Sequence, residues 1–310
     1  MNNRQGKFGV LFIGLAFILS GCATNAVTGR SQLMLVSEES AITQSDSAYS
    51  ALIGGLSDSG KISRDEKLIA RIQGITDRLV AQAVSYRPVV KDWKWSIKII
   101  DDPETVNAFC MAGGKMAIYT GLIDKLKPTD DEIAQVMGHE ISHALASHQA
   151  EKMSVQLAAE LAVVAITESQ NKSNKKNVHA AASLATAALI ALPNSRSQES
   201  EADRLGIELA AKAGYAPHAA VTLWEKMMKA SGQTSRFDFL STHPASPKRV
   251  EALAALEGDM MPLYEVGKAG RVAQAKSFAT VVTDPAVAGM PAKPSRSKKK
   301  SKTKKGAAQI

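Results

Sequence analysis

The chain has 310 residues, enough for one large domain or two small ones, and a low aromatic content that favours a helix-rich fold. Its net charge is +8, but ten basic residues lie near the two ends, and without them 28 basic residues stand against 30 acidic ones. The body of the chain is therefore close to neutral, which argues against nucleic acid as a partner. After the first 20 residues, no apolar run approaches the length of a membrane-spanning helix.

Residues 1–21 are predicted to be a lipoprotein signal peptide. Arg4 and Lys7 form a positive start, and the apolar stretch 8–19 is too short to span a membrane comfortably. The segment ends in Leu-Ser-Gly-Cys, which resembles a bacterial lipobox and predicts lipidation of Cys22; an ordinary signal peptide with an incidental cysteine is the alternative. Because Ala23 follows rather than Asp, the usual sorting rule predicts a lipid anchor in the bacterial outer membrane, facing the periplasm.

Residues 22–60 are expected to form a polar tether (25–35) and a first helix, which opens at Ser37 and closes at Gly54-Gly55. The stretch 63–86 has the apolar stripe of an amphipathic helix. The other cysteine, Cys110, lies among apolar residues, so we expect it to be buried and inert.

Two strands are predicted before the middle of the chain, over 93–100 and 115–120. The pair Gly113-Gly114 favours a tight hairpin immediately before the second strand. That strand either offers an open edge to an extended peptide or belongs to a purely structural unit.

The sequence His139-Glu140-Ile141-Ser142-His143 lies in a predicted helix from about 130 to 153, which starts with a capping box between Thr129 and Glu132. Residues four apart share a helix face, so His139 and His143 can bind one metal ion together. Glu140 lies next to the first ligand, where it can accept a proton from a water beside the metal. This arrangement is typical of a zinc hydrolase.

A catalytic zinc needs one further protein ligand. A third histidine six residues after His143 is excluded because Gln149 occupies that position, and His148, one residue away, is expected to face solvent. Glu199 and Asp203 share a helix face, so Glu199 can complete the site while Asp203 accepts a hydrogen bond from a ligand histidine. Glu201 is an alternative ligand on another face; a charged helix surface is the alternative for the whole stretch.

These motifs, together with Asn107-Ala108-Phe109 before the paired glycines, resemble the gluzincin metallopeptidases of the HtpX and CAAX-prenyl-protease kind, in particular their periplasmic lipoprotein members. The resemblance covers roughly 25–256 and implies one Zn²⁺ per chain, held by His139, His143 and Glu199, with Glu140 as catalytic base. The stretch Thr242-His243-Pro244 also resembles a family motif. His243 is then expected to bind substrate or an oxyanion, or to occupy the open zinc position; it is otherwise a turn residue.

The expected fold is α+β and mostly helical: a zincin-type metallopeptidase with a small hairpin or sheet beside the metal helix. Its domain should span 61–270, with two Ala-rich packed helices (155–166 and 180–192), a mobile polar loop between them, and a disordered Lys-rich tail at 285–310. The expected function is a zinc metalloendopeptidase that cleaves unfolded or misassembled envelope proteins. The alternatives are a chaperone-like outer-membrane assembly factor and an anion-binding protein acting through the tail.

Overall fold

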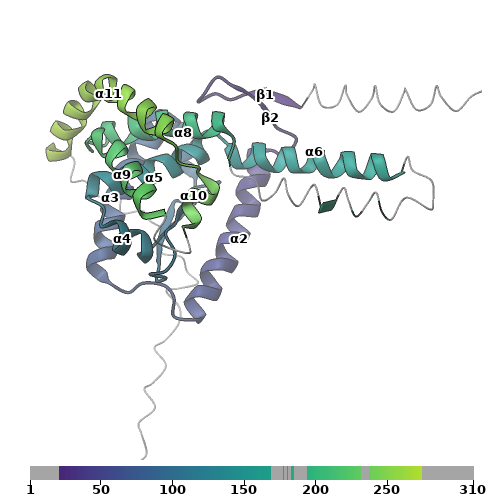
Figure 1. The fold of residues 1–310 in the computed structure, drawn as a ribbon, viewed down its shortest axis with the longest axis horizontal. Helices are drawn as coiled ribbons and strands as arrows, with labels where there is room; N and C mark the ends of the chain where they lie inside the picture. The colour runs from purple at the N-terminus through teal and green to yellow at the C-terminus, as the bar shows by residue number, and fades with distance from the viewer. Residues whose placement is uncertain are drawn as a thin grey trace, which may run out of the picture.

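Helices dominate the computed structural model, which describes residues 21–168, 194–231 and 237–273 and the single positions 177, 180, 183 and 184 (Figure 1). The helices are α2 (Glu38–Asp58), α3 (Glu66–Tyr86), α4 (Thr120–Leu126), α5 (Asp130–Leu145), α6 (His148–Glu168), α8 (Arg196–Lys212), α9 (His218–Ser231), α10 (Asp238–Thr242) and α11 (Pro247–Ala273), with a 3-10 turn at Pro88–Asp92. The strands are β1 (Cys22–Thr24), β2 (Ser31–Leu33), β3 (Ser96–Ile100), β4 (Ala108–Met111) and β5 (Lys115–Tyr119). The prediction of a mostly helical α+β fold is confirmed.

The helix α5 is the centre of the core, surrounded by other elements (Figure 1). Thr129 caps its first turn through the predicted capping box with Glu132, and every residue from Glu132 to Leu145 is buried. Burial on all sides removes water from the helix, so its polar side chains must bind one another or a ligand.

The helix α8 crosses α5 in direct backbone contact. A Cβ atom placed on Gly206 would lie 2.8 Å from the backbone nitrogen of His139, and one on Gly138 would lie 2.9 Å from the carbonyl oxygen of Gly206. Glu199 and Asp203 lie seven and three residues before Gly206, on the same face of α8. The two glycines therefore allow α8 to bring both carboxylates against the metal helix.

The prediction of one helix from 130 to 153 is wrong, because the chain breaks at Ala146-Ser147 between α5 and α6. Ser147 has a left-handed backbone (φ 54°), which ends the helical path. Side chains of the β1–β2 hairpin occupy the break: Asn25 Nδ2 and Gln32 Nε2 both donate to the carbonyl oxygen of Ala146, at 2.8 and 2.9 Å. The stretch expected as a tether is thus a hairpin bound to the end of α5.

The larger sheet has the strand order β3-β5-β4, with β3 and β5 parallel and the predicted β4–β5 hairpin antiparallel. Gly113 and Gly114 both have positive φ, at 81° and 78°, as the tight turn requires. Of the two alternatives for the strand before α5, the open edge is wrong: β5 is the central strand, and the outer strands are β3 and β4, of which β4 packs against α5.

Two further expectations differ from the described residues. The helix α2 continues through Gly54-Gly55 to Asp58. The distal half of α6 is largely exposed: Leu161, Val164 and Ile166 are more than half exposed, and α6 projects away from the body in Figure 1. The expected signal peptide (except Gly21), most of the loop and helix between 169 and 193, and the tail at 285–310 lie outside the described residues. Among the helices that the structure describes, none combines the length and apolarity needed to cross a membrane.

Candidate metal centre

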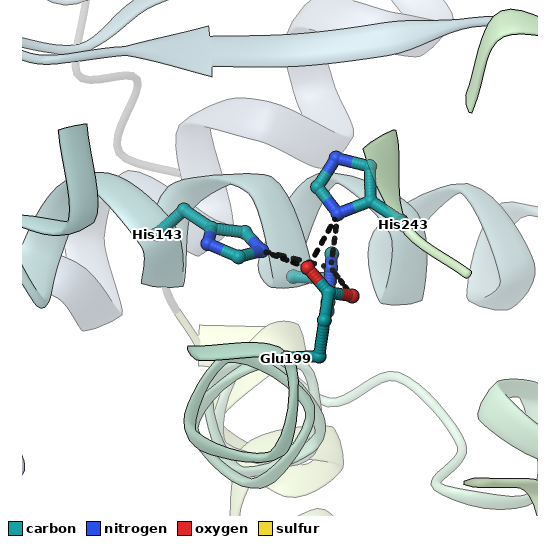
Figure 2. Close-up of side chains that lie close together, drawn as sticks. His143, Glu199 and His243 are labelled. Atoms are coloured by element: carbon teal, nitrogen blue, oxygen red, sulfur yellow. Dashed lines mark hydrogen bonds and ion pairs between the residues drawn. The ribbon is translucent and has the colours of Figure 1, made fainter. Parts of the chain in front are cut away.

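Four buried side chains from three segments converge at the middle of α5: His139, His143, Glu199 and His243. Figure 2 shows Glu199 reaching from its helix toward His143 and His243, with its carboxylate between the two rings. Their candidate ligand atoms all lie within 4.8 Å of one another. His243 follows α10 directly, and it is held by the stack of its ring on Phe239 at 4.6 Å between centroids.

The ring nitrogens and one carboxylate oxygen converge within about hydrogen-bonding distance of one another. His139 Nε2 lies 3.1 Å from His143 Nε2 and 3.2 Å from His243 Nδ1. Glu199 Oε1 lies 2.9 Å from His243 Nδ1 and 3.3 Å from His143 Nε2. Three imidazole nitrogens and a carboxylate oxygen facing one point form the donor set that a tetrahedral zinc ion prefers. These residues therefore fit the zinc ion that the sequence predicts.

At His143 and Glu199, burial and hydrogen bonding favour the protonation states that a metal ligand needs. Burial lowers the pKa of His143 well below its ordinary value, so the ring is neutral. Burial alone would raise the pKa of Glu199, but hydrogen bonds with three histidines outweigh it and bring that pKa far below the usual range. Glu199 is therefore ionised, and its second oxygen, Oε2, lies 2.6 Å from Arg249 Nη1.

His139 is supported by a carboxylate and an arginine. Its Nδ1 lies 3.0 Å from Asp203 Oδ1, and Arg249 holds Asp203 with two bonds of 2.6 and 2.7 Å. The guanidinium of Arg249 also lies over the ring of Trp224, 3.7 Å from its centroid. Asp203 thus fixes the His139 ring with its proton on Nδ1 and Nε2 turned to the cluster.

Glu140 has the environment of a general base. It is buried beside the cluster, and its Oε1 has no hydrogen-bond partner among the described residues, although His243 Nε2 lies 3.4 Å away. Burial chiefly raises the pKa of Glu140, against the opposing charges of His243 and His139. The backbone of Cys110 in β4 opposes this rise in the pKa of Glu140, so the strand lies close to the carboxylate.

The expectation that His148 faces solvent is wrong. His148 is only 3% exposed, and its Nδ1 lies 2.8 Å from His143 Nδ1. Its other nitrogen lies 2.8 Å from Glu201 Oε2, so Glu201 belongs to this contact rather than to the metal cluster. The helix break at Ala146-Ser147 turns His148 back toward His143, and no periodicity in the sequence signals such a turn.

Sequence reasoning also missed Arg249 and Asn194. Asn194 Nδ2 donates to Glu199 Oε1 at 3.0 Å. In the sequence, Arg249 follows Lys248 at the start of a helix and has no feature that separates it from a surface residue.

Cys110 is half-buried against the core, and burial raises the pKa of its thiol well above the ordinary value, in keeping with an inert cysteine.

The model for peptidase family M48 matches residues 66–257, a stretch that contains the whole cluster together with Asp203 and Arg249. The chain is 36% identical over 180 residues to the mitochondrial metalloendopeptidase OMA1 of Arabidopsis thaliana, covering 57% of this chain and 35% of that protein. It is 30% identical over 268 residues to the Bos taurus OMA1, covering 84% of this chain and 50% of the relative. It is also 33% identical over 148 residues to the metalloprotease LoiP of Escherichia coli, covering 47% of this chain and 56% of that protein.

These relatives correct one expectation and limit another. The predicted location in a bacterial outer membrane is overturned, because the OMA1 relatives from plant, yeast and mammal are named as mitochondrial proteins. The chain spans about half the length, or less, of the first curated relatives it matches. The match over most of the chain and the geometry of the cluster agree that this chain belongs to peptidase family M48.

Proposed function

We propose that the chain is a zinc-dependent endopeptidase with Glu140 as its general base. The observation that carries this proposal is the position of Glu140. Its carboxylate is buried, its Oε1 has no hydrogen-bond partner among the described residues, and it lies beside the four candidate metal ligands and an outer β-strand. When bound, Zn²⁺ supplies Lewis-acid chemistry, polarising a scissile carbonyl and lowering the pKa of a nearby water.

The residues of the chain supply the proton transfers. Glu140 accepts a proton from the attacking water and passes it to the leaving amine. Its raised pKa suits the first step, because a carboxylate with a higher pKa is a stronger base and accepts the proton of a water more readily than an ordinary carboxylate. His139, His143 and Glu199 would hold the metal, and His243, whose candidate ligand atom lies at the same point, would be a fourth ligand or a contact for substrate.

The outer strand β4 is the proposed platform for the substrate. In the described part of the chain, β4 pairs only with β5, so its second edge can pair with an extended peptide. Because the backbone of Cys110 lies close to Glu140, a peptide paired with β4 would lie near the catalytic carboxylate. Because strand pairing requires an extended segment, the substrates we propose are unfolded or misassembled proteins.

The variant Glu140→Gln tests the mechanism, because it keeps the size of the side chain and removes the base. We expect it to retain one zinc per chain and to cleave casein at least about a hundredfold more slowly than the wild type. Glu208→Gln is the matched control, since Glu208 lies on α8 in an ion pair with Lys212, outside the cluster. If Glu140→Gln keeps its zinc and cleaves casein at the wild-type rate, the mechanism is wrong and a holding function without proteolysis is favoured.

Lipidation of Cys22, and with it a place in the lipoprotein branch of the family, is a further part of the proposal. Cys22 lies exposed at the start of β1, where an acyl chain would not disturb the core. Mass spectrometry of peptides from the protein, purified from its native host and digested, tests this proposal. The masses of the acyl chains should appear on a peptide that begins at Cys22. An unmodified cysteine in that peptide would contradict it.

A further inference from the structure

The β1–β2 hairpin lies on the segment between α5 and α6, far in sequence from the residues it contacts. Besides the bonds of Asn25 and Gln32 to Ala146, Arg30 makes a two-bond contact with Glu151 of α6, at 2.6 and 2.7 Å. A third bond, from Arg30 Nε to Glu201 Oε1 of α8, is also 2.6 Å. One arginine of the hairpin therefore joins α6 to α8 next to the metal centre.

From Arg30 an unbroken chain of short contacts leads to a metal ligand. The second oxygen of Glu201 lies 2.8 Å from His148 Nε2, and His148 Nδ1 lies 2.8 Å from His143 Nδ1. His148 is buried, so water cannot replace either contact without cost. Arg30 is thus three contacts from the cluster.

The proton positions along this chain are set by the metal. His143 turns Nε2 to the cluster, so a bound metal needs the lone pair there and leaves the ring proton on Nδ1. That proton is donated to His148 Nδ1, which therefore keeps its own proton on Nε2. His148 donates it in turn to Glu201, whose other oxygen accepts from Arg30. Every donor in this series of contacts, from His143 to Arg30, meets an acceptor.

We infer that Arg30 is a positioning residue for His143, acting through Glu201 and His148, so that the docked N-terminal hairpin governs how tightly the centre holds its metal. Partners of this kind fix the ring orientation of a metal-bound histidine and its proton position. Arg30 lies outside the matched family region 66–257, so the support comes from a segment that the family model does not include. The inference rests on the metal centre of the proposed enzyme, not on its substrate.

The test compares Arg30→Gln with Arg87→Gln in the full-length, zinc-loaded protein, using the rate at which a chromophoric chelator removes zinc. Arg87 is a matched control: it binds Glu38 with two bonds of 2.7 Å and also bonds the end of α5 at Leu145, but it contacts none of the histidines that the structure describes. We expect Arg30→Gln to release zinc about tenfold faster and Arg87→Gln to stay within about twofold of the wild type. Equal rates for Arg30→Gln and the wild type, or equal acceleration by both variants, would overturn the inference.

Two further measurements separate positioning from a general loss of structure. Cobalt-substituted Arg30→Gln should show a shifted visible absorption band, because that band reports ligand geometry, whereas the Arg87→Gln band should match the wild type. Combining Arg30→Gln with Glu201→Gln should accelerate zinc release no more than either change alone, since both interrupt the same series of contacts to His143. If Arg30→Gln does not fold, Glu201→Gln alone decides by the same criteria. Zinc release needs no substrate, so failure of casein cleavage would count against the proposed function alone.

Discussion

His139 and His143 each turn one nitrogen to the cluster and the other to a carboxylate–arginine support, but the two supports come from opposite ends of the chain. His139 bonds Asp203, which is held by Arg249 of α11; His143 reaches Glu201 through His148, and Glu201 is held by Arg30 of the hairpin. The side chain of Arg249 is 8% exposed, against 25% for Arg30. The first support is short and enclosed, whereas the second is longer, with its arginine partly in water.

This difference determines how much each support should matter. A charge pair in the interior is strongly coupled to its neighbours, and removing one partner leaves the other buried and unpaired. A partly exposed arginine can recover hydration when its partner is lost. We therefore expect changes on the His139 side to be more damaging than the corresponding changes on the His143 side.

The largest effect should come from the contact that both supports share. Asp203 and Glu201 both lie on α8, whose backbone meets α5 at Gly206. Gly206→Ala places a methyl group against the backbone of His139, so α8 must move outward and displace both carboxylates. We expect loss of stoichiometric zinc and a destabilisation of about 1–3 kcal/mol, measured by metal analysis and thermal unfolding. Gly258→Ala, on α11 with open space around it, is the control; normal zinc content in Gly206→Ala would contradict the role of this contact.

A smaller effect is expected from breaking only the enclosed support. Asp203→Asn should weaken zinc binding by about 10- to 100-fold, because His139 loses its charged acceptor and Arg249 loses its two-bond partner. Competition with a chelator of known affinity measures this change. A weakening equal to or below that of Glu201→Gln would show that the two supports do not differ as their burial predicts.

The last prediction concerns the proton that zinc must displace. Burial alone would lower the pKa of His139, but hydrogen bonds with Asp203 and Glu199 outweigh it and raise that pKa to about 9. Without metal, His139 is therefore protonated at pH 7, and zinc binding must release that proton. Between about pH 7 and 9 the apparent affinity for zinc should rise about tenfold per pH unit, as one linked proton requires. Calorimetry in buffers of different ionisation enthalpy counts the proton; no release at pH 7 would contradict the assignment, and Asp203→Asn should reduce it.

Local patterns in the sequence were sufficient where the interacting residues lie within one element. The spacing of His139 and His143, the capping box at Thr129 and the Gly113-Gly114 turn each depend on a few neighbouring residues. Helical spacing likewise grouped Glu199 with Asp203, because residues four apart share a face in any helix. The mostly helical α+β class follows from the same local signals.

Contacts between distant segments were decided only by the tertiary structure. The break after Leu145 depends on hairpin side chains more than 100 residues away, so the sequence around it continues to resemble a helix. For the same reason His148 was expected at the surface, and an open edge on β5 stood as one of two alternatives although β5 lies between β3 and β4. By itself the sequence determined which side chains can bind zinc and which carboxylate can act as base. Only the packing of α8, α11 and the hairpin around α5 decided what supports those ligands, because burial and hydrogen bonding between distant segments have no local pattern.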